Sequence, residues 1–143
     1  MSKKYSSSAL GASLTISGLD KYLEKIKAAG KNIEEACKAA VNVATPIVEA
    51  DMKAGAERHK DSGAVVDAIE STRAQADGYG VWASVGIDTE KHPEAIHAVY
   101  QEYGDGHSPR FPDPFVRPAV DNNKAKIKSI EKAELKKWGV PVE

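Results

Sequence analysis

Cysteine is nearly absent from this sequence, in which Cys37 is the single residue of its kind. A lone cysteine excludes an intrachain disulfide and a zinc site built from cysteines. Because Cys37 lies within a helical pattern, we expect a small buried hydrophobic side chain and not a reactive thiol. Long hydrophobic runs are also missing, since none approaches the ~20 residues that span a bilayer. The N-terminal stretch lacks the apolar core of a secretory signal, so neither a leader nor a membrane contact is expected.

Net charge is low as well, at −1 over 143 residues, so the chain as a whole has no strong attraction for nucleic acid. The charge is nevertheless unevenly spread. Residues 1–60 carry ten basic and seven acidic side chains, residues 61–121 four and eleven, and residues 122–143 six and three. An acidic middle between basic ends is suited to stacking of the chain with copies of itself. Ordinary solvated surface is the simpler explanation for any single charge.

Length and composition indicate one globular domain. A content of 41% hydrophobic and 29% charged residues is typical of soluble proteins with a real core. Residues 1–12 are expected to form a disordered tail, and residues 13–143 a single domain. Within Ser13–Ser17 the residues alternate, with Leu14 and Ile16 on one face, which predicts a short edge strand.

A long helical pattern follows, after a capping box formed by Ser17 and Asp20. Its apolar residues recur at alternating spacings of three and four and form a narrow seam. Pro46 lies inside the pattern, and because proline removes a backbone hydrogen bond we expect a kink or a break there. The seam comprises Leu19, Tyr22, Ile26, Ala29, Ile33, Ala36, Ala40, Val43, Ile47, Ala50 and Ala54.

The second half of the chain predicts a hairpin and three further helices. The arms 71–76 and 81–88 flank the turn Asp77–Gly80, which is rich in residues that tolerate positive φ. A short helix over 64–70 precedes the hairpin, and two helices over about 93–103 and 118–138 follow it. The inward residues of the last two helices are expected to be Ala95, Ile96, Val99, Tyr100 and Tyr103, and then Val120, Ile127, Ile130, Leu135 and Trp138.

The expected fold class is therefore α+β. A small antiparallel sheet built on the hairpin should pack against a long N-terminal helix and a C-terminal helix. In the second hairpin arm the faces are expected to separate cleanly. Val81, Ala83, Val85 and Ile87 should share the buried face, with Trp82, Ser84 and Gly86 on the other.

Histidines raise the question of a metal site. His92 and His97 are five residues apart and do not share a helical face. His107 lies near Glu102 and Asp105, whose oxygens are possible ligands. No pair has the spacing that places two imidazoles on one side of a helix, so solvated histidines are expected and no metal.

Nucleophilic catalysis finds no support either. Ser62, Ser108 and Cys37 lie in no strand–turn–helix elbow, and no Gly-x-Ser-x-Gly is present. Residues 104–106 (Gly-Asp-Gly) resemble part of a phosphate loop, yet no Gly-Lys-Ser/Thr follows. We expect no enzyme activity and no cofactor.

The distinctive stretch is Tyr100–Val120, which holds four prolines, two glycines and three of the chain's aromatic residues besides Tyr100. Because proline fixes φ and pushes the preceding residue toward extended geometry, the stretch predicts a stiff, shaped loop between two helices. Asp113-Pro114 and Arg117-Pro118 each place a proline where a helix can begin. Phe111 and Phe115 give the loop apolar surface. Such a loop is typical of a binding element or of a clamp between neighbouring units.

Three stretches carry a family resemblance. Ile16–Asp20 (Ile-Ser-Gly-Leu-Asp) matches an opening of strand, Gly-Leu and long helix. Lys60–Ile69 matches a segment Thr-Gly-x-Leu-x-x-Ser-Ile, with Ser62 in place of Thr and Ala68 in place of Ser. The most specific stretch is Tyr100–Gly104 followed by Pro-Phe-Val-Arg-Pro-Ala-Val at 114–120, against Tyr-x-x-Glu-Phe-Gly and Pro-Phe-Leu-Arg-Pro-Ala-Leu. In order and spacing, over about residues 14–137, the chain resembles the tail-component family of long-tailed bacteriophages and prophages.

The resemblance implies a structural virion protein of the neck or tail end, acting in tail completion, as a tail terminator or as a head–tail connector. It implies a homo-oligomeric ring, expected to be a hexamer, that joins the tail to the head and lets double-stranded DNA pass. Neighbouring neck and tail-tube proteins would be its partners, and assembly would take place in the cytoplasm of the bacterial host. The implied fold is α+β, with a hairpin-based sheet on a long helix.

Contacts with other subunits or with neighbouring virion proteins are expected on the proline loop and its flanks, because ring subunits join unlike surface patches. An alternative is a small DNA- or protein-binding accessory factor that uses the lysine-rich last helix. A metal-dependent hydrolase is a third possibility and would require bound metal. The expected contact residues are Tyr100, Glu102, Tyr103, Arg110, Phe111, Phe115, Arg117 and Pro118.

Overall fold

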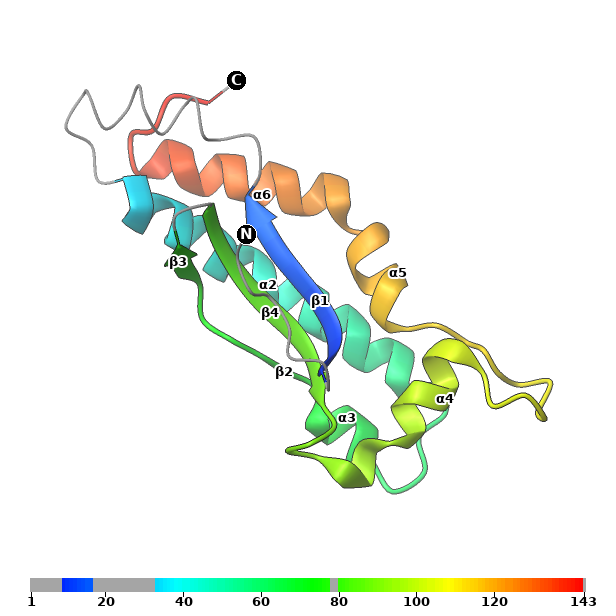
Figure 1. Ribbon diagram of the computed structural model, residues 1–143. Coiled ribbons are helices and arrows are strands. Elements are labelled where there is room, and N and C mark those ends of the chain that lie inside the picture. The colour runs from blue at the N-terminus through cyan, green and yellow to red at the C-terminus, as the bar shows by residue number, and fades with distance from the viewer. Residues whose placement is uncertain (1–8, 17–32, 78–79, 143) are drawn as a thin grey trace.

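The computed structural model describes residues 9–16, 33–77 and 80–142. A small antiparallel sheet lies against the long helix α2 (Ile33–Glu57), and the C-terminal helices α5 (Val116–Asp121) and α6 (Lys124–Lys137) pack beside α2 (Figure 1). The predicted α+β class is confirmed. The predicted start of the long helix and the turn residues 78–79 lie outside the described residues.

The strand β4 (Gly80–Asp88) is the centre of the sheet. It pairs antiparallel with β1 (Ala9–Ile16) on one side and with β2 (Glu70–Ser71) and β3 (Gln75–Asp77) on the other. Buried and half-buried residues alternate along β4 without interruption. The predicted inward face is confirmed, with Val81, Ala83, Val85 and Ile87 all buried.

The first hairpin arm is interrupted, although the sequence predicted one unbroken strand. Residues 72–74 of this arm face only two residues of β4, which makes a β-bulge. Thr72, at the start of the bulge, is held to Ser84 by two hydrogen bonds, since its N–H donates to Ser84 O and its Oγ1 accepts from Ser84 N, each at 2.9 Å. The N–H of Ala74 turns out of the sheet and donates to Asn42 Oδ1 of α2 at 2.8 Å. The bulge therefore ties the hairpin to the long helix.

The strand β1 begins at Ala9, four residues before its predicted start. Residues 9–12 thus belong to the sheet and not to the predicted disordered tail, of which residues 1–8 lie outside the described part of the chain. The reason is the partner strand. The nine-residue β4 offers ladder positions from Asp88, opposite Ala9, to Val81, opposite Ile16. Pairing with it extends a strand that local propensity alone would end sooner.

The sequence predicted a kink or a break at Pro46, and the break is wrong, because helix α2 continues through this residue. Proline costs about 3 kcal/mol inside a helix. Here Val41 and Ala44 before it and Val48 after it are fully buried. Tertiary packing of this kind supplies most of the stability of a protein helix and outweighs the lost bond. Beside it, Thr45 Oγ1 donates to Val41 O at 2.7 Å.

The predicted seam is confirmed at Ile33, Ala36 and Ala40 and wrong at Val43, Ala50 and Ala54, and its members before Ile33 lie outside the described residues. Val43 is 41% exposed, and Ala44, Val48 and Met52 are buried in its place. Strict spacings of three and four suit a supercoiled helix, and a straight helix drifts from them by about 20° per heptad. Because α2 packs on a sheet and on two helices, it buries a wider face than a coiled-coil seam.

The predicted last helix is divided into α5 and α6 by Asn122 and Asn123. Asn123 Nδ2 bonds to Ala119 O at 2.7 Å and to Asp51 Oδ2 of α2 at 2.6 Å. Ile127 and Leu135 are buried as predicted, whereas Trp138, expected inward, is 46% exposed.

The remaining short helices precede the proline loop. They are α3 (Ala64–Ala68), the 3₁₀ turn η1 (Pro93–Ala95) and α4 (His97–Tyr103). The predicted end of α4 at Gly104 is confirmed, where the backbone takes φ 94°. These elements lie at the end of the sheet farthest from the N-terminus of α2 and the C-terminus of α6 (Figure 1).

Candidate functional site

The proline loop is fastened to the C-terminal end of α2. Arg58 grips the carboxylate of Asp113 with two hydrogen bonds, Nε to Oδ2 at 3.0 Å and Nη2 to Oδ1 at 2.9 Å, and also donates to Pro114 O. His59 Nε2 bonds to Asp113 Oδ2 at 2.7 Å. The hydrogen bonds from Arg58 and then His59 lower the pKa of Asp113 to about 2. The loop is thus a braced element, as its prolines predicted, and its brace comes from a distant part of the sequence.

The same bonds define the state of His59. Arg110 Nη2 lies 3.1 Å from His59 Nδ1, and a guanidinium can only donate. Nδ1 is therefore an acceptor, and the ring proton sits on Nε2, which donates it to Asp113. The ring of Phe111 packs edge-on to His59 with centroids 4.9 Å apart, and the Arg110 guanidinium lies 5.5 Å from the Phe111 centroid.

The carboxylate of Glu102 caps the N-terminus of α5. It is fully buried, and its Oε2 accepts the backbone N–H groups of Phe115 at 2.8 Å and Val116 at 2.9 Å. Arg117 Nε completes the set at 2.9 Å from Oε1. Burial on its own would raise the pKa of Glu102, but the hydrogen bonds from Val116, Phe115 and Arg117 prevail and lower it. A carboxylate 13 residues upstream thus satisfies the free N–H groups at the helix start.

Phe115 sits directly on α2 at Gly55. A Cβ added to Gly55 would lie 2.6 Å from Phe115 Cβ, closer than real Cβ atoms come. Gln101 fixes the same junction from α4, with its Nε2 donating to Gly55 O at 3.0 Å. The backbone carbonyl oxygen of Gln101 accepts the N–H of Asp113 at 2.7 Å. Glycine is needed at position 55 because the loop and the helix touch there.

Helix α4 turns its large apolar side chains outward. Ile96 is 46%, Tyr100 43% and Tyr103 62% exposed. The prediction that these residues face the core is wrong, because Ala95, Ala98, Gln101 and Glu102 occupy the inward face. At spacings of four and three residues, the outward side chains line one side of the helix. We call Ile96, Tyr100 and Tyr103 the outward stripe.

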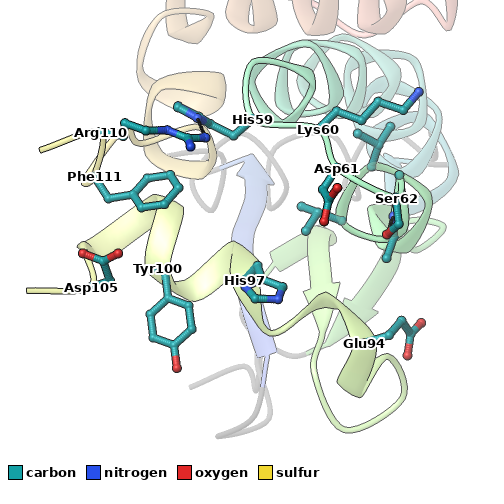
Figure 2. A pocket seen from close by; sticks show the side chains of 14 residues that line it. His59, Lys60, Asp61, Ser62, Glu94, His97, Tyr100, Asp105, Arg110 and Phe111 are labelled. Carbon is teal, nitrogen blue, oxygen red and sulfur yellow. Dashed lines mark hydrogen bonds between the residues drawn. The ribbon is translucent and has the colours of Figure 1, made fainter. Parts of the chain in front are cut away.

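A cleft of about 480 Å³ lies between the connection from α2 to α3 and the helix α4 (Figure 2). Val65 and Val66 of α3 and Tyr100 of α4 contribute apolar surface. Its charged lining is mixed, and Figure 2 shows Asp61 and Glu94 on one side with Arg110 and Asp105 on the other. The cleft and the outward stripe share Tyr100 and so form one continuous surface.

The structure divides the predicted contact residues by exposure. Glu102 and Phe115 are buried and stabilise the subunit from within, so they offer no surface to a partner. Phe111 and Pro118 are half-buried. Tyr100, Tyr103, Arg110 and Arg117 are exposed, and Arg117 lies over the Tyr103 ring at 5.4 Å from its centroid. A role of these exposed residues in an interface stays a prediction.

Sequence reasoning missed the residues that hold the loop in place. Gly55 lies in the last turn of α2, Arg58 and His59 follow its end, and all three are more than 50 positions from their partners at 110–115. Gly55 within a helical pattern was one available signal, because an unexplained helical glycine often marks a close approach.

Within residues 9–16, 33–77 and 80–142, no three His, Cys, Asp or Glu side chains are grouped so as to hold a metal ion. In the same residues no helix is long and apolar enough to cross a bilayer.

Comparison with known proteins identifies the class. The family described as "Bacteriophage HK97-gp10, putative tail-component" matches residues 18–104, more than half of the chain. The chain therefore belongs to the HK97 gp10-like family of bacteriophage tail components, and the predicted family is confirmed. The match ends at Gly104, ahead of the stretch Pro114–Val120 that carried much of the resemblance. No curated protein and no solved structure gave a match.

Proposed function

We propose that this tail component forms a homo-oligomeric ring at the neck or tail end of the virion. In this role it completes the tail, joins it to the head and lets double-stranded DNA pass, and it performs no catalysis. Family membership supports a place in the tail. The observation that carries the ring is the outward stripe of α4.

An exposed apolar stripe on a rigid base is a feature of protein interfaces. In the described residues the exposed large hydrophobic side chains are Val43, Trp138 and the three of the outward stripe. Three of the five thus gather on one short helix, and aromatic residues are enriched where proteins meet. The helix is anchored through Gln101 and Glu102, so little ordering entropy is lost when a partner binds.

Rings need two unlike surfaces on each subunit, because a patch that meets a different patch next door can close a circle. The uneven charge of the chain supports such a contact, with its acidic middle and its basic C-terminal end. Six subunits and contacts with neck and tail-tube neighbours are part of the proposal, as is assembly in the host cytoplasm.

Passage of DNA calls for a channel wall that does not hold phosphates. We place the acidic side chains of the middle region on that wall, where they repel the DNA backbone. Replacing Asp77 and Glu90, which lie outside the cleft beside α4, by neutral residues should slow DNA ejection. Unchanged ejection from particles carrying both replacements would remove this part of the proposal.

Electron microscopy and light scattering of the purified protein test the ring itself. We expect closed rings of identical subunits and a molar mass several times 15.3 kDa. Monomers in solution, together with purified particles that lack a ring of this protein, would refute the proposal.

A second candidate is an accessory factor that binds DNA through α6. Five of the six lysines of α6 are exposed, namely Lys124, Lys126, Lys128, Lys136 and Lys137. Phosphate contacts by these lysines would be blind to sequence and sensitive to salt. A DNA mobility-shift assay at two salt concentrations separates this candidate from the ring, for which no stable complex is expected.

A further inference from the structure

Trp138 is the largest exposed apolar side chain at the C-terminal end of α6. It caps the helix and is 46% exposed, although its neighbours Leu135 and Val140 are buried. A tryptophan held by a helix end keeps few rotamers to lose, and tryptophan is prominent among residues that dominate binding energy. Lys136 and Lys137 stand next to it, and both are exposed.

The cleft beside α4 has the complementary character. Its volume of about 480 Å³ lies within the roughly 300–1,000 Å³ of pockets that enclose small-molecule-sized groups, so it can admit an indole ring. Val65, Val66 and Tyr100 provide apolar and aromatic surface for such a ring. An aromatic pair adds binding energy beyond the area it buries.

The charges around the cleft leave one carboxylate available. The cations of its lining are already engaged, since Lys60 pairs with Glu57 at 3.7 Å and Arg110 donates to His59 at 3.1 Å. Asp61 makes no hydrogen bond or ion pair with any other described residue. Glu94 Oε1 lies 3.2 Å from His92 Nδ1, and Asp105 Oδ1 accepts the N–H groups of His107 and Ser108. Asp61 is therefore the carboxylate of the cleft lining that stays available. A basic group is therefore the suitable neighbour for an inserted ring.

The two features lie at opposite ends of the molecule. The C-terminal end of α6 adjoins the N-terminal part of α2, whereas α3 and α4 lie beyond the C-terminal end of α2 (Figure 1). One subunit cannot bring its own Trp138 into its own cleft, and a second copy can. We propose that the cleft between α3 and α4 receives Trp138 of a neighbouring copy of this chain, with Lys136 of that copy beside Asp61. This inference rests on the proposed ring and specifies its joint.

Such a joint is heterologous, because a protruding side chain of one copy meets a cleft of the next. Each subunit keeps one free cleft and one free tryptophan until the chain of contacts closes. The outward stripe is continuous with the cleft through Tyr100. It would flank the inserted indole of Trp138 and exclude water around it.

Removal of the indole side chain of Trp138 is the first test. Trp138→Ala should weaken self-association, measured by sedimentation or mass photometry, by at least about 30-fold, as expected for an interface residue worth 2 kcal/mol. Val43→Ala, at a similarly exposed position on α2, serves as the matched control and should leave association unchanged. Self-association of Trp138→Ala within threefold of the wild-type value would overturn the inference.

Mixing two defective variants is the sharper test. Asp61→Lys/Glu94→Lys should block the cleft but keep the tryptophan, whereas Trp138→Ala keeps the cleft. Each alone should remain monomeric, and an equimolar mixture should form a dimer and nothing larger, since only one joint can form. The pair Lys126→Glu/Lys128→Glu, on α6 but remote from its end, is the control for charge change alone. A mixture that stays monomeric, or that builds complete rings, contradicts the joint.

Photo-crosslinking covers the case in which the isolated protein does not assemble. A benzophenone amino acid at position 138 should crosslink to residues 60–66 or 94–100 of another copy, in the purified protein or in phage particles. Crosslinks between copies at other sites would be consistent with the proposed ring and would overturn this joint. An absence of any crosslink between copies in either preparation would count against the ring as well.

Discussion

Glu102 and Arg117 hold each other at both the side chain and the backbone. Arg117 Nε donates to Glu102 Oε1 at 2.9 Å and its backbone N–H to the same oxygen at 3.2 Å, while Arg117 Nη2 donates to Glu102 O at 3.0 Å. The end of α4 is thereby joined to the start of α5, and the proline loop between them is closed at its base. The loop can therefore present its outer surface to a partner while the junction between α4 and α5 stays folded.

Removal of the Glu102 carboxylate should destabilise the subunit. In Glu102→Ala the buried N–H groups of Phe115 and Val116 lose their acceptor, and each such loss costs about 1–3 kcal/mol. We expect a loss of about 3 kcal/mol or more in the free energy of unfolding, measured in urea, and a smaller loss for Glu102→Gln. Glu90→Gln, at an exposed position, is the control. A loss below about 1 kcal/mol for Glu102→Ala would show that the cap matters little.

Gly55→Ala should be destabilising in spite of the better helix propensity of alanine. Propensity favours alanine by about 1 kcal/mol, but the new methyl group would lie 2.6 Å from Phe115 Cβ and 3.3 Å from its Cα. Overpacking of this kind costs about 1–3 kcal/mol, and the displaced loop adds to it. Thermal unfolding should therefore begin at a lower temperature than in the wild type. Ala54→Ser, one position earlier on the exposed side of α2, should change little, and a stabilised Gly55→Ala would contradict the contact.

Asp113 should make the loop sensitive to acid. Its pKa is lowered to about 2 by Arg58 and His59, below the ordinary value near 3.9. Its contribution is therefore fully present above about pH 4 and is lost as the pH falls toward 2. Asp113→Asn should remove that part of the acid dependence and, at neutral pH, speed tryptic cleavage after Arg110. Equal cleavage rates for Asp113→Asn and the wild type would argue against the brace.

Glu131 should have the opposite pH dependence. Burial on α6 raises its pKa from 4.5 to about 7. Burial, and after it the charge of Glu131, raise the pKa of the Cys37 thiol to about 11. The folded state holds the proton of Glu131 more tightly, so stability falls as the pH rises from about 4.5 to 7 and is level above that. Glu131→Gln should abolish this slope and stabilise the protein at pH 8, on the order of 1 kcal/mol after allowance for its partial exposure. A wild-type stability that rises between pH 5 and 8 in a Glu131-dependent way would contradict the burial effect.

The sequence predicted well the features that local patterns determine. The alternation along β4, the hairpin, the burial of Cys37 and the end of α4 at Gly104 follow from neighbours within a few positions. The prolines likewise predicted a loop of defined shape.

The orientation of α4 could not be predicted in this way. Apolar Ile96, Tyr100 and Tyr103 suggested the core, but the inward face carries Gln101 and Glu102. Their partners lie at Gly55 and at 115–117, up to 46 positions away, and no periodicity reveals such pairs. The extent of β1 and the continuity of α2 through Pro46 were missed for the same reason, because tertiary contacts outweigh local preference.

The central claim is that α4 presents a subunit contact of a virion ring. The most direct measurement is electron microscopy with mass photometry of the wild type and of Ile96→Ala/Tyr103→Ala, two exposed positions whose change should leave the circular dichroism spectrum and melting temperature intact. The account predicts closed rings for the wild type and dispersed subunits for the folded variant. Rings of equal abundance and equal mass in both samples would contradict it.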